Sequence, residues 1–306
     1  MKISTGQVFE RAVTQMTTQQ AKLAQMQTQL ASGKQIVQPS DDPDKAGIIQ
    51  RLNTAYKRQE VYETSLDSVN NRLVAEESAL MGTDNILQRL RELAVRASSD
   101  TLTAGDRKII AIEVSTLKDA VVALSNTQDI TGNYVFSGSM TKTIPFAIDN
   151  VGATVYKGDD RYVEVDVSEQ LRLAMNRPGN EVFASVVRQE AGSNAQRVSF
   201  FSVIDDFVSA LNNNETGGIQ RSLAEVSEMS ENLSGSLADV GSRMLVVDSQ
   251  REMLSDAKLR YKTLLSGVED LDYAKAVTAL SAEMLSLEAA QSSFAKISQL
   301  SLFNYM

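Results

Sequence analysis

The chain has 306 residues with 30 Lys plus Arg against 39 Asp plus Glu, a net charge of −9, and no His, Cys or Trp. The absence of Cys and His excludes disulfides, thiolate metal sites, cysteine nucleophiles and histidine proton transfer, so enzymes are a disfavoured class. The acidic balance, with its Arg and Lys scattered, argues against a nucleic-acid partner, because such binders gain affinity by neutralising phosphates.

The first segment predicts a coiled-coil helix that ends near Gly33. Its apolar residues recur every seven positions, a period typical of a helix that packs along another helix. The second row of the heptad pattern consists of Ala12, Gln19, Met26 and Gly33. Gln19 and Gly33 interrupt it, so the apolar seam is thin. Gly33 followed by Lys34 is a favourable helix C-terminus. The seven-residue row consists of Phe9, Met16, Leu23, Leu30 and Val37.

A second, much longer helix is predicted from Pro43 to about Ala97. Asp42 suits the N-cap, Pro43 the first helical position, and Asp44 the positive end of the helix. About 55 residues at 1.5 Å per residue give about 80 Å, which is a rod that packs against other rods. One heptad row consists of Leu52, Leu66, Leu73, Leu80 and Leu87. The polar interruptions of the seam are Gln59, Glu76 and Thr83.

A third helix is predicted after a break at residues 98–100. It starts at Thr103 or Asp106 and ends near Gly132. Its predicted apolar face consists of Ile109, Ile112, Leu117, Val121 and Leu124.

Residues 133–197 predict a small β-rich insert. Residues 161–167 alternate between apolar and polar types, and turn-forming sequences such as 157–160 separate the strands. The aromatic residues gathered here are interpreted as the core of this insert and not as a binding platform.

The helical period resumes after Phe200 and continues nearly to Met306. One row keeps its seven-residue spacing without a miss: Val226, Leu233, Val240, Val247, Leu254, Tyr261 and Val268. The final helix carries Tyr273, Leu280, Leu287 and Phe294, with Val277 and Met284 beside them.

These elements predict a mainly α fold with a β-rich insert, in which both termini form a long antiparallel coiled-coil helical rod. Residues 1–38 carry four basic and one acidic side chain, and residues 267–306 carry five acidic and two basic ones, which mildly favours pairing of the two ends. Each end buries too little apolar surface to offset its ordering cost, so we expect both to order against neighbouring copies. The candidate subunit-interface residues are Phe9, Met16, Leu23, Leu30, Leu280, Leu287 and Phe294.

No motif for catalysis, a cofactor or a metal is found. A phosphate loop and a dinucleotide fingerprint are absent, and the Ser-x-x-Lys matches stand alone, as expected by chance. No apolar run approaches the roughly 20 residues of a membrane span. Residues 1–7 lack an apolar region, so no Sec-type signal peptide is predicted. Taken alone, that would indicate the cytoplasm.

Motifs at both ends of the chain resemble the flagellin-like family of bacterial flagellins and hook–filament junction proteins. The N-terminal motifs are QLASGK at 29–34, PSDDP at 39–43 and ELAVRA at 92–97. Residues 132–138, GNYVFSG, resemble the entry to the variable domain of the junction group. The C-terminal motifs are DVGSR at 239–243, SGVEDLDYA at 266–274 and SQLSLFNY at 298–305. One departure is Leu271, where Val or Ile is more usual in the family.

The resemblance implies a structural subunit of the flagellum and no enzyme, cofactor or metal. It implies a homo-oligomeric ring between hook-associated protein 1 and the flagellin filament, and no nucleic acid or membrane partner. It also implies an extracellular location, export without a cleaved signal peptide, and a cytoplasmic flagellar export chaperone. A short flagellin that forms the filament itself, and an enzyme or effector with its site in the insert, are the alternatives.

The resemblance and the heptad pattern together suggest three domains. Residues 1–42 and 267–306 would form a terminal coiled coil that lines an inner tube. Residues 43–132 and 198–266 would form the long helical rod, and residues 133–197 an outward-facing β-rich domain.

Overall fold

The structure is a computed structural model that describes residues 5–188 and 195–303. The first four residues and the end of the C-terminal motif, Asn304 and Tyr305, lie outside the described residues. The helices are α1 (Thr5–Ser32), α2 (Pro43–Ala97), α3 (Ala104–Ser125), α4 (Gly179–Val182), α5 (Phe200–Asn212), α6 (Thr216–Glu269) and α7 (Tyr273–Phe303). The predicted mainly α class with a β-rich insert is confirmed, and the chain forms two compact units, Met1–Gln59 with Asp256–Met306, and Glu60–Ser255.

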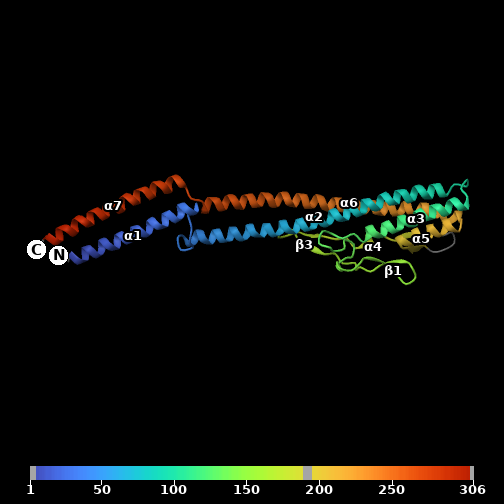
Figure 1. The fold of residues 1–306 in the computed structure, drawn as a ribbon, viewed down its shortest axis with the longest axis horizontal. Coiled ribbons are helices and arrows are strands. Elements are labelled where there is room, and N and C mark those ends of the chain that lie inside the picture. The colour runs from blue at the N-terminus through green and yellow to red at the C-terminus, as the bar shows by residue number, and fades with distance from the viewer. Residues whose placement is uncertain (1–4, 189–194, 304–306) are drawn as a thin grey trace. The chain divides into compact units, whose positions relative to one another are not determined.

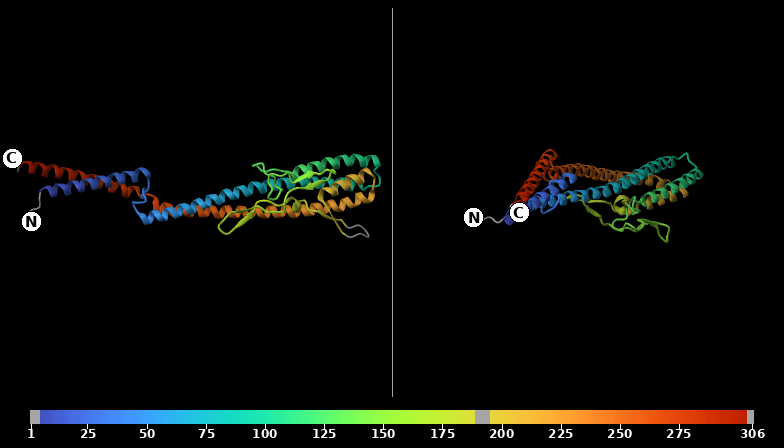
Figure 2. Two further views of the ribbon diagram at one scale, coloured as in Figure 1. Left: turned by 90° about the horizontal axis from the view of Figure 1, so that it is seen from below. Right: turned by 60° about the vertical axis from the view of Figure 1, so that its left-hand side comes forward.

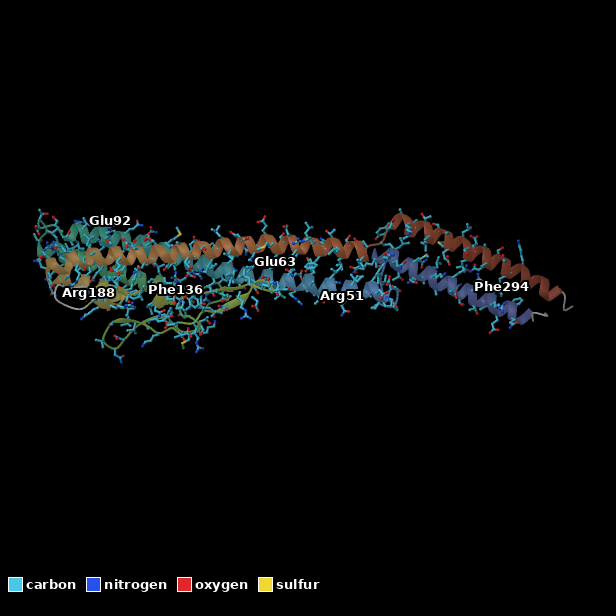
Figure 3. The ribbon with its side chains drawn as sticks, turned by 180° about the vertical axis from the view of Figure 1, so that it is seen from behind. Arg51, Glu63, Glu92, Phe136, Arg188 and Phe294 are labelled. Carbon is cyan, nitrogen blue, oxygen red and sulfur yellow. The ribbon has the colours of Figure 1, made fainter. Side chains whose placement is uncertain are left out.

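The first unit contains the terminal helices α1 and α7, which lie side by side and antiparallel (Figures 1 and 2). Near one end of the pair, the Phe9 and Phe294 rings meet edge to face at 5.1 Å, and Phe294 lies between the two helices (Figure 3). At the other end, α1 stops before Gly33, whose φ of +70° suits glycine. A Cβ on Gly33 would lie 2.8 Å from the Tyr273 hydroxyl, so a larger residue would also have to displace the end of that exposed side chain.

Short linkers connect these terminal helices to the long helices, and the two linkers are bonded to each other. The Gln35 N–H donates to the Glu269 carbonyl at 2.7 Å, and the Leu271 N–H donates to the Gly33 carbonyl at 3.0 Å. Lys34 forms an ion pair with Glu269. An aspartate caps the start of each helix that follows a linker. At the start of α2 the side chain of Asp42 accepts the Lys45 N–H at 3.1 Å, and at the start of α7 the side chain of Asp272 accepts the Lys275 N–H at 3.1 Å. The predicted cap at Asp42 and the start of α2 at Pro43 are confirmed.

The second unit is built on α2 and α6, which run side by side within it (Figure 1). Their facing rows are buried, since the heptad row of α2 from Leu66 to Leu87 is 0% exposed. Polar contacts join the two helices along their length, from Arg251–Asp67 at 2.5 Å to Ser230–Asp84 at 3.2 Å. On α6 the predicted row is confirmed in this unit by its buried members: Val226, Leu233, Val240, Val247 and Leu254.

The β-rich insert consists of three separate antiparallel hairpins. They pair β1 (Phe146–Ile148) with β2 (Thr154–Tyr156), β3 (Glu164–Asp166) with β4 (Arg172–Ala174), and β5 (Val186–Arg188) with β6 (Gln196–Val198). Buried phenylalanine rings hold the region together at centroid distances of 5.1–5.9 Å. They are Phe136, Phe146, Phe183, Phe200 and Phe201. The interpretation of the aromatic residues as core is therefore confirmed.

The predicted apolar face of α3 is wrong in part. Ile109 and Ile112 are 68% and 69% exposed, whereas Ile110 and Val114 are buried. The residues of α3 that are buried, such as Ile110, follow the 3.6-residue helical period but lie one position later in the sequence than the predicted residue Ile109. They form the side of α3 that packs against α5. The helix also ends at Ser125, earlier than the predicted end near Gly132.

A further break interrupts the helical stretch after the insert. α5 ends at Asn212, and a turn through Asn214 at φ 56° precedes α6. The sequence pattern predicts no break here, because the turn contains no proline. The turn is possible because Asn is one of the few residues other than glycine that adopts this left-handed conformation.

Candidate subunit interface

The seven predicted interface residues all lie on α1 or α7, and each side chain is half-buried. The structure brings Phe9 and Phe294 into ring contact and places Leu23 and Leu287 on one groove of about 460 Å³. Met16, Leu30 and Leu280 take the same half-buried positions along the helices. None of the seven reaches the near-complete burial of the α2 row, so the terminal seam is covered from one side only.

Polar side chains further weaken this terminal seam. Gln19 and Glu283 are half-buried within the rows. The amide of Gln19 donates to the Ser286 hydroxyl at 3.0 Å, while its buried carbonyl oxygen has no hydrogen-bond partner among the described residues. A buried acceptor without a donor costs about 1–3 kcal/mol. The α1–α7 pair is thus an incompletely satisfied contact.

The outward side of α7 is also apolar, which corrects the predicted seam. Val277 and Met284 lie beside Leu280 on the helix, three residues back and four residues on, but they turn away from α1: they are 51% and 53% exposed, and Leu285 is 68% exposed. The helix turns about 100° per residue, so the companions of Leu280 facing α1 are the positions three residues on or four residues back, among them Ala276. α7 therefore presents one apolar face to α1 and a second face to solvent.

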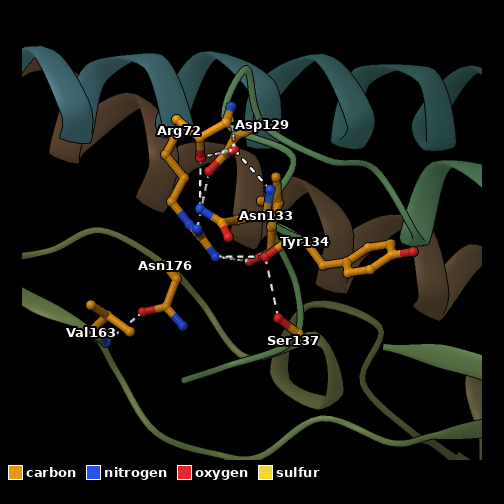
Figure 4. A network of polar contacts seen from close by, with 9 residues as sticks. Arg72, Asp129, Asn133, Tyr134, Ser137, Val163 and Asn176 are labelled. Atoms are coloured by element: carbon orange, nitrogen blue, oxygen red, sulfur yellow. Dashed lines mark hydrogen bonds and ion pairs between the residues drawn. The ribbon is translucent and has the colours of Figure 1, made fainter. Parts of the chain in front are cut away.

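A buried arginine anchors the start of the β-rich insert to α2 (Figure 4). The guanidinium of Arg72, a residue only 4% exposed, donates to the carbonyls of Tyr134 at 2.7 Å and Val135 at 3.0 Å and pairs with Asp129 at 3.3 Å. Burial lowers the pKa of Arg72. Burial alone would raise the pKa of Asp129, but hydrogen bonds from Thr131 and the backbone, with the charge of Arg72, hold it below its usual value.

A second arginine fixes the β5–β6 hairpin. Arg188 donates to both carboxylate oxygens of Glu225 on α6, at 2.6 and 2.9 Å, and to Asp206 on α5 at 2.6 Å. Because Arg188 donates these hydrogen bonds, first to Glu225 and then to Asp206, its pKa is raised above its usual value. Bidentate pairing of this kind fixes the orientation of both groups.

A third contact links the insert to the α2–α6 seam. Arg177 lies 3.6 Å from Asp239, which pairs with Arg243 at 3.0 Å, and Arg243 in turn reaches Glu76 at 3.0 Å. Glu76 is 0% exposed, and burial raises its pKa despite Arg243. In the sequence, Glu76 stands out only as a break in the heptad row, and nothing marks the four arginines Arg72, Arg177, Arg188 and Arg243.

The described residues hold no arrangement suited to metal chemistry. They contain no group of three or more Asp or Glu side chains placed to hold a metal ion. Among the same residues, no helix is long and apolar enough to cross a membrane.

Paired terminal helices, a long buried helix pair and an inserted β region make a mainly α fold of the kind found in solved structures of flagellar junction proteins. In agreement, residues 3–141 match the family model for the bacterial flagellin N-terminal helical region. The chain is 25% identical to flagellar hook-associated protein 3 of Escherichia coli strain K12 and of Salmonella typhimurium, over 99% of each chain in both comparisons. The crystal structure of Xanthomonas campestris FlgL has the same fold, with a TM-score of 0.64, 22% identity, and coverage of 71% of this chain and 99% of that one.

The resemblance inferred from the sequence motifs is therefore confirmed, over the full length of the chain. The relatives are structural proteins of the flagellum and not enzymes, and this chain is similar to flagellar hook-associated proteins and flagellins. The prediction of a non-enzymatic structural protein of the flagellum is confirmed on that ground.

Proposed function

We propose that this chain is the junction subunit of a bacterial flagellum, placed between hook-associated protein 1 and the flagellin filament. The observation that carries the proposal is the similarity to flagellar hook-associated protein 3, which extends over 99% of both chains. Similarity of that extent includes the terminal seam, the long helices and the insert together, and not a shared helical segment alone.

The proposed mechanism is self-assembly through the terminal helices into a homo-oligomeric ring. Residues 1–42 and 267–306 form the inner coiled-coil tube, residues 43–132 and 198–266 the rod, and residues 133–197 the outward domain. The half-burial of Phe9, Leu287 and Phe294 supports this role, because a neighbouring copy would remove the rest of their apolar surface from water at about 25 cal/mol per Å². The buried Gln19 oxygen would gain a donor in the same step.

The proposal includes the other partners and the location. The ring contacts hook-associated protein 1 on one side and flagellin on the other, outside the cell. Before assembly, the chain is exported without a cleaved signal peptide and is held by a cytoplasmic flagellar export chaperone. The apolar outer face of α7, with Met284 and Leu285 exposed, gives a chaperone a surface to cover.

A flagellin that forms the filament itself is the second candidate, since residues 3–141 match the flagellin N-terminal model. The two roles differ in copy number. A junction ring needs few copies per flagellum, whereas a filament needs thousands of copies. Quantitative mass spectrometry of sheared flagella, with the chain measured against the hook protein, separates them.

The seam is tested by placing a charge in it. Leu280→Asp and Leu287→Asp are expected to leave the Glu60–Ser255 unit folded and to abolish joining of the filament to the hook, because a carboxylate in an apolar seam is strongly unfavourable. The measurements are swimming motility and electron microscopy of filament attachment. Ala289→Asp, which adds the same charge at an exposed position of α7, is the matched control and is expected to retain attachment. Normal motility of the Leu280 and Leu287 variants would contradict the interface.

A further inference from the structure

The charged side chains of the terminal helices are not paired with each other within the chain. The sequence predicts attraction between a basic N-terminal and an acidic C-terminal segment, but no ion pair found in the described part of the chain joins α1 to α7. The pair between Lys34 and Glu269 lies outside both helices. The charges of α1 and α7 are therefore available for contacts with another chain.

One flank of the α1–α7 pair is marked by the hydrogen bond from Gln19 to Ser286. Ser286 of α7 comes directly before Leu287, a residue of the row that faces α1. Lys22 of α1 comes directly before Leu23, which faces α7 in the same way. Because the two helices are antiparallel and turn in the same hand, positions that directly precede a facing residue lie on the same flank of the pair. Lys22 therefore shares the flank of Ser286.

Two more basic side chains lie on this flank. Arg11 precedes Lys22 by eleven positions, which is about three full turns of a helix with 3.6 residues per turn. Lys275 precedes Ser286 of α7 by the same number of positions. All three basic side chains are exposed, and none forms an ion pair with another described residue. Arg11, Lys22 and Lys275 together form what we call the basic flank.

The groove of about 460 Å³ opens on the opposite flank of the same pair. Glu288 lines it and lies two positions after Ser286, about 200° round the helix, so these two side chains point to opposite flanks. Leu23, Met284 and Leu285 supply the apolar lining. Met284 is 53% and Leu285 68% exposed, and Glu288 is exposed without an ion pair among the described residues. We call this surface the acidic groove.

The acidic groove suits the side chain of a lysine or arginine. The long apolar stem of such a side chain packs on apolar surface, here Met284 and Leu285, while its charged head reaches water or a carboxylate. Glu288 supplies that carboxylate at the edge of the groove. Glu283, the other acidic residue of α7, is half-buried in the row that faces α1 and does not line the groove. The groove therefore selects a basic side chain that comes from outside the pair.

We propose that the α1–α7 pairs of neighbouring copies pack head to tail, with the basic flank of one copy on the acidic groove of the next and Lys22 paired with Glu288. The two surfaces lie on opposite flanks, so each copy offers one surface to each of its two neighbours. Repetition of such a heterologous contact closes a ring when the rotation between copies allows it. This arrangement rests on the proposed self-assembly and adds the direction of the contact, its charge complementarity and its ion pair.

The direction of the contact is tested by cysteine cross-linking in isolated flagella, since the chain has no cysteine of its own. Flagella built from a mixture of Lys22→Cys and Glu288→Cys chains are treated with a short bis-maleimide, because a Lys–Glu pair holds its Cα atoms too far apart for a disulfide. Cross-linked dimers are expected from the mixture, and none from flagella that contain either variant alone. Ser293→Cys is the matched control, because Ser293 is exposed and lies on the same flank as Ser286, seven positions on. Its mixture with Lys22→Cys is expected to give no dimers.

Three results would overturn the head-to-tail contact: no dimers from the Lys22→Cys and Glu288→Cys mixture, dimers from either variant alone, or as many dimers with Ser293→Cys. Mass spectrometry of the flagella checks that both variants are present. Absence of the unmodified chain from flagella would instead contradict the proposed function, so the two failures are distinguishable.

The ion pair is tested by exchanging its charges in the full chain. Glu288→Lys and Lys22→Glu, each alone, are expected to lower the number of attached filaments about tenfold, because like charges then meet across the contact. A chain with both changes is expected to regain attachment to within about threefold of the unmodified chain. Circular dichroism checks that each variant is folded. Single variants that attach normally, or a double variant no better than either single one, would overturn the pairing of Lys22 with Glu288.

Discussion

Two pairs of antiparallel helices share one sequence pattern and differ in burial. In the Glu60–Ser255 unit, the heptad rows of α2 and α6 are covered, with Leu66, Leu87 and Val226 all 0% exposed. In the terminal pair α1–α7, the equivalent positions such as Leu23 and Leu287 are only half-buried. The difference arises because α3, α5 and the insert supply additional packing to the first pair, whereas two helices alone leave their seam open on one side.

A seven-residue period therefore identifies where a helix packs, but not how completely. The α2–α6 pair is completed within the chain, and its burial is a source of folding stability. The α1–α7 pair keeps apolar surface exposed on two faces, including Val277 and Leu285. Its surface is available for contacts with other chains, so in the proposed function stability and assembly would depend on different helices of one molecule.

The largest expected effect concerns protease resistance. In the free chain, limited proteolysis is expected to remove α1 and α7 and to leave the Glu60–Ser255 unit, because thinly buried helices open at low free-energy cost. In assembled flagella the same protease is expected to spare both ends. Mass spectrometry of the fragments measures the difference. Equal resistance of the ends in both states would remove the distinction between the two helix pairs.

The second effect compares one leucine from each pair. Leu87→Ala is expected to lower the free energy of unfolding by about 3 kcal/mol, since it leaves a cavity at a position that is 0% exposed. Leu287→Ala is expected to lower the free energy of unfolding by less in the free chain, by about 1 kcal/mol, because that side chain is partly exposed and leaves no closed cavity. Urea denaturation followed by circular dichroism gives both values. Equal losses would show that the terminal seam is as well buried as the central one.

The long elements could be predicted because their signals are local. Asp42 and Pro43 mark the start of α2 by cap chemistry, Gly33 marks the end of α1, and the Val226 row repeats often enough to fix a helix face. Shorter elements carry fewer repeats. Over α3, rows through Ile109 and Ile110 both fit a helical period, and only packing against α5 decides between them.

The arginine contacts of the insert could not be predicted, because their partners are remote in sequence. Arg72 contacts residues 57 to 63 positions away, and Arg188 pairs with Glu225, 37 positions away. In sequence these side chains look like solvated charges of a helix and a strand. The periodicity predicts which residues of α1 and α7 form the candidate interface. It does not predict that Val277 is exposed, because that depends on which face of α7 is covered by α1.

The smallest expected effect is a pH dependence that separates buried from exposed ion pairs. Burial raises the pKa of Glu76, so the folded chain binds its proton more tightly than the unfolded chain does. This contribution to stability is present below the usual glutamate pKa of about 4.3 and is lost as the pH rises through the raised value. The Glu76→Gln variant lacks the titrating group.

As the pH is lowered through this window, the unfolding free energy of the unmodified chain is therefore expected to rise relative to that of Glu76→Gln. Urea denaturation at a series of pH values measures the difference. Asp67→Asn is the control, because Asp67 pairs with Arg251 across the same two helices while 57% exposed, and solvent weakens such pairs. If both variants differ from the unmodified chain by an amount independent of pH, then burial of Glu76 does not control its charge. The seam around Arg243 would in that case be as open to water as the terminal pair.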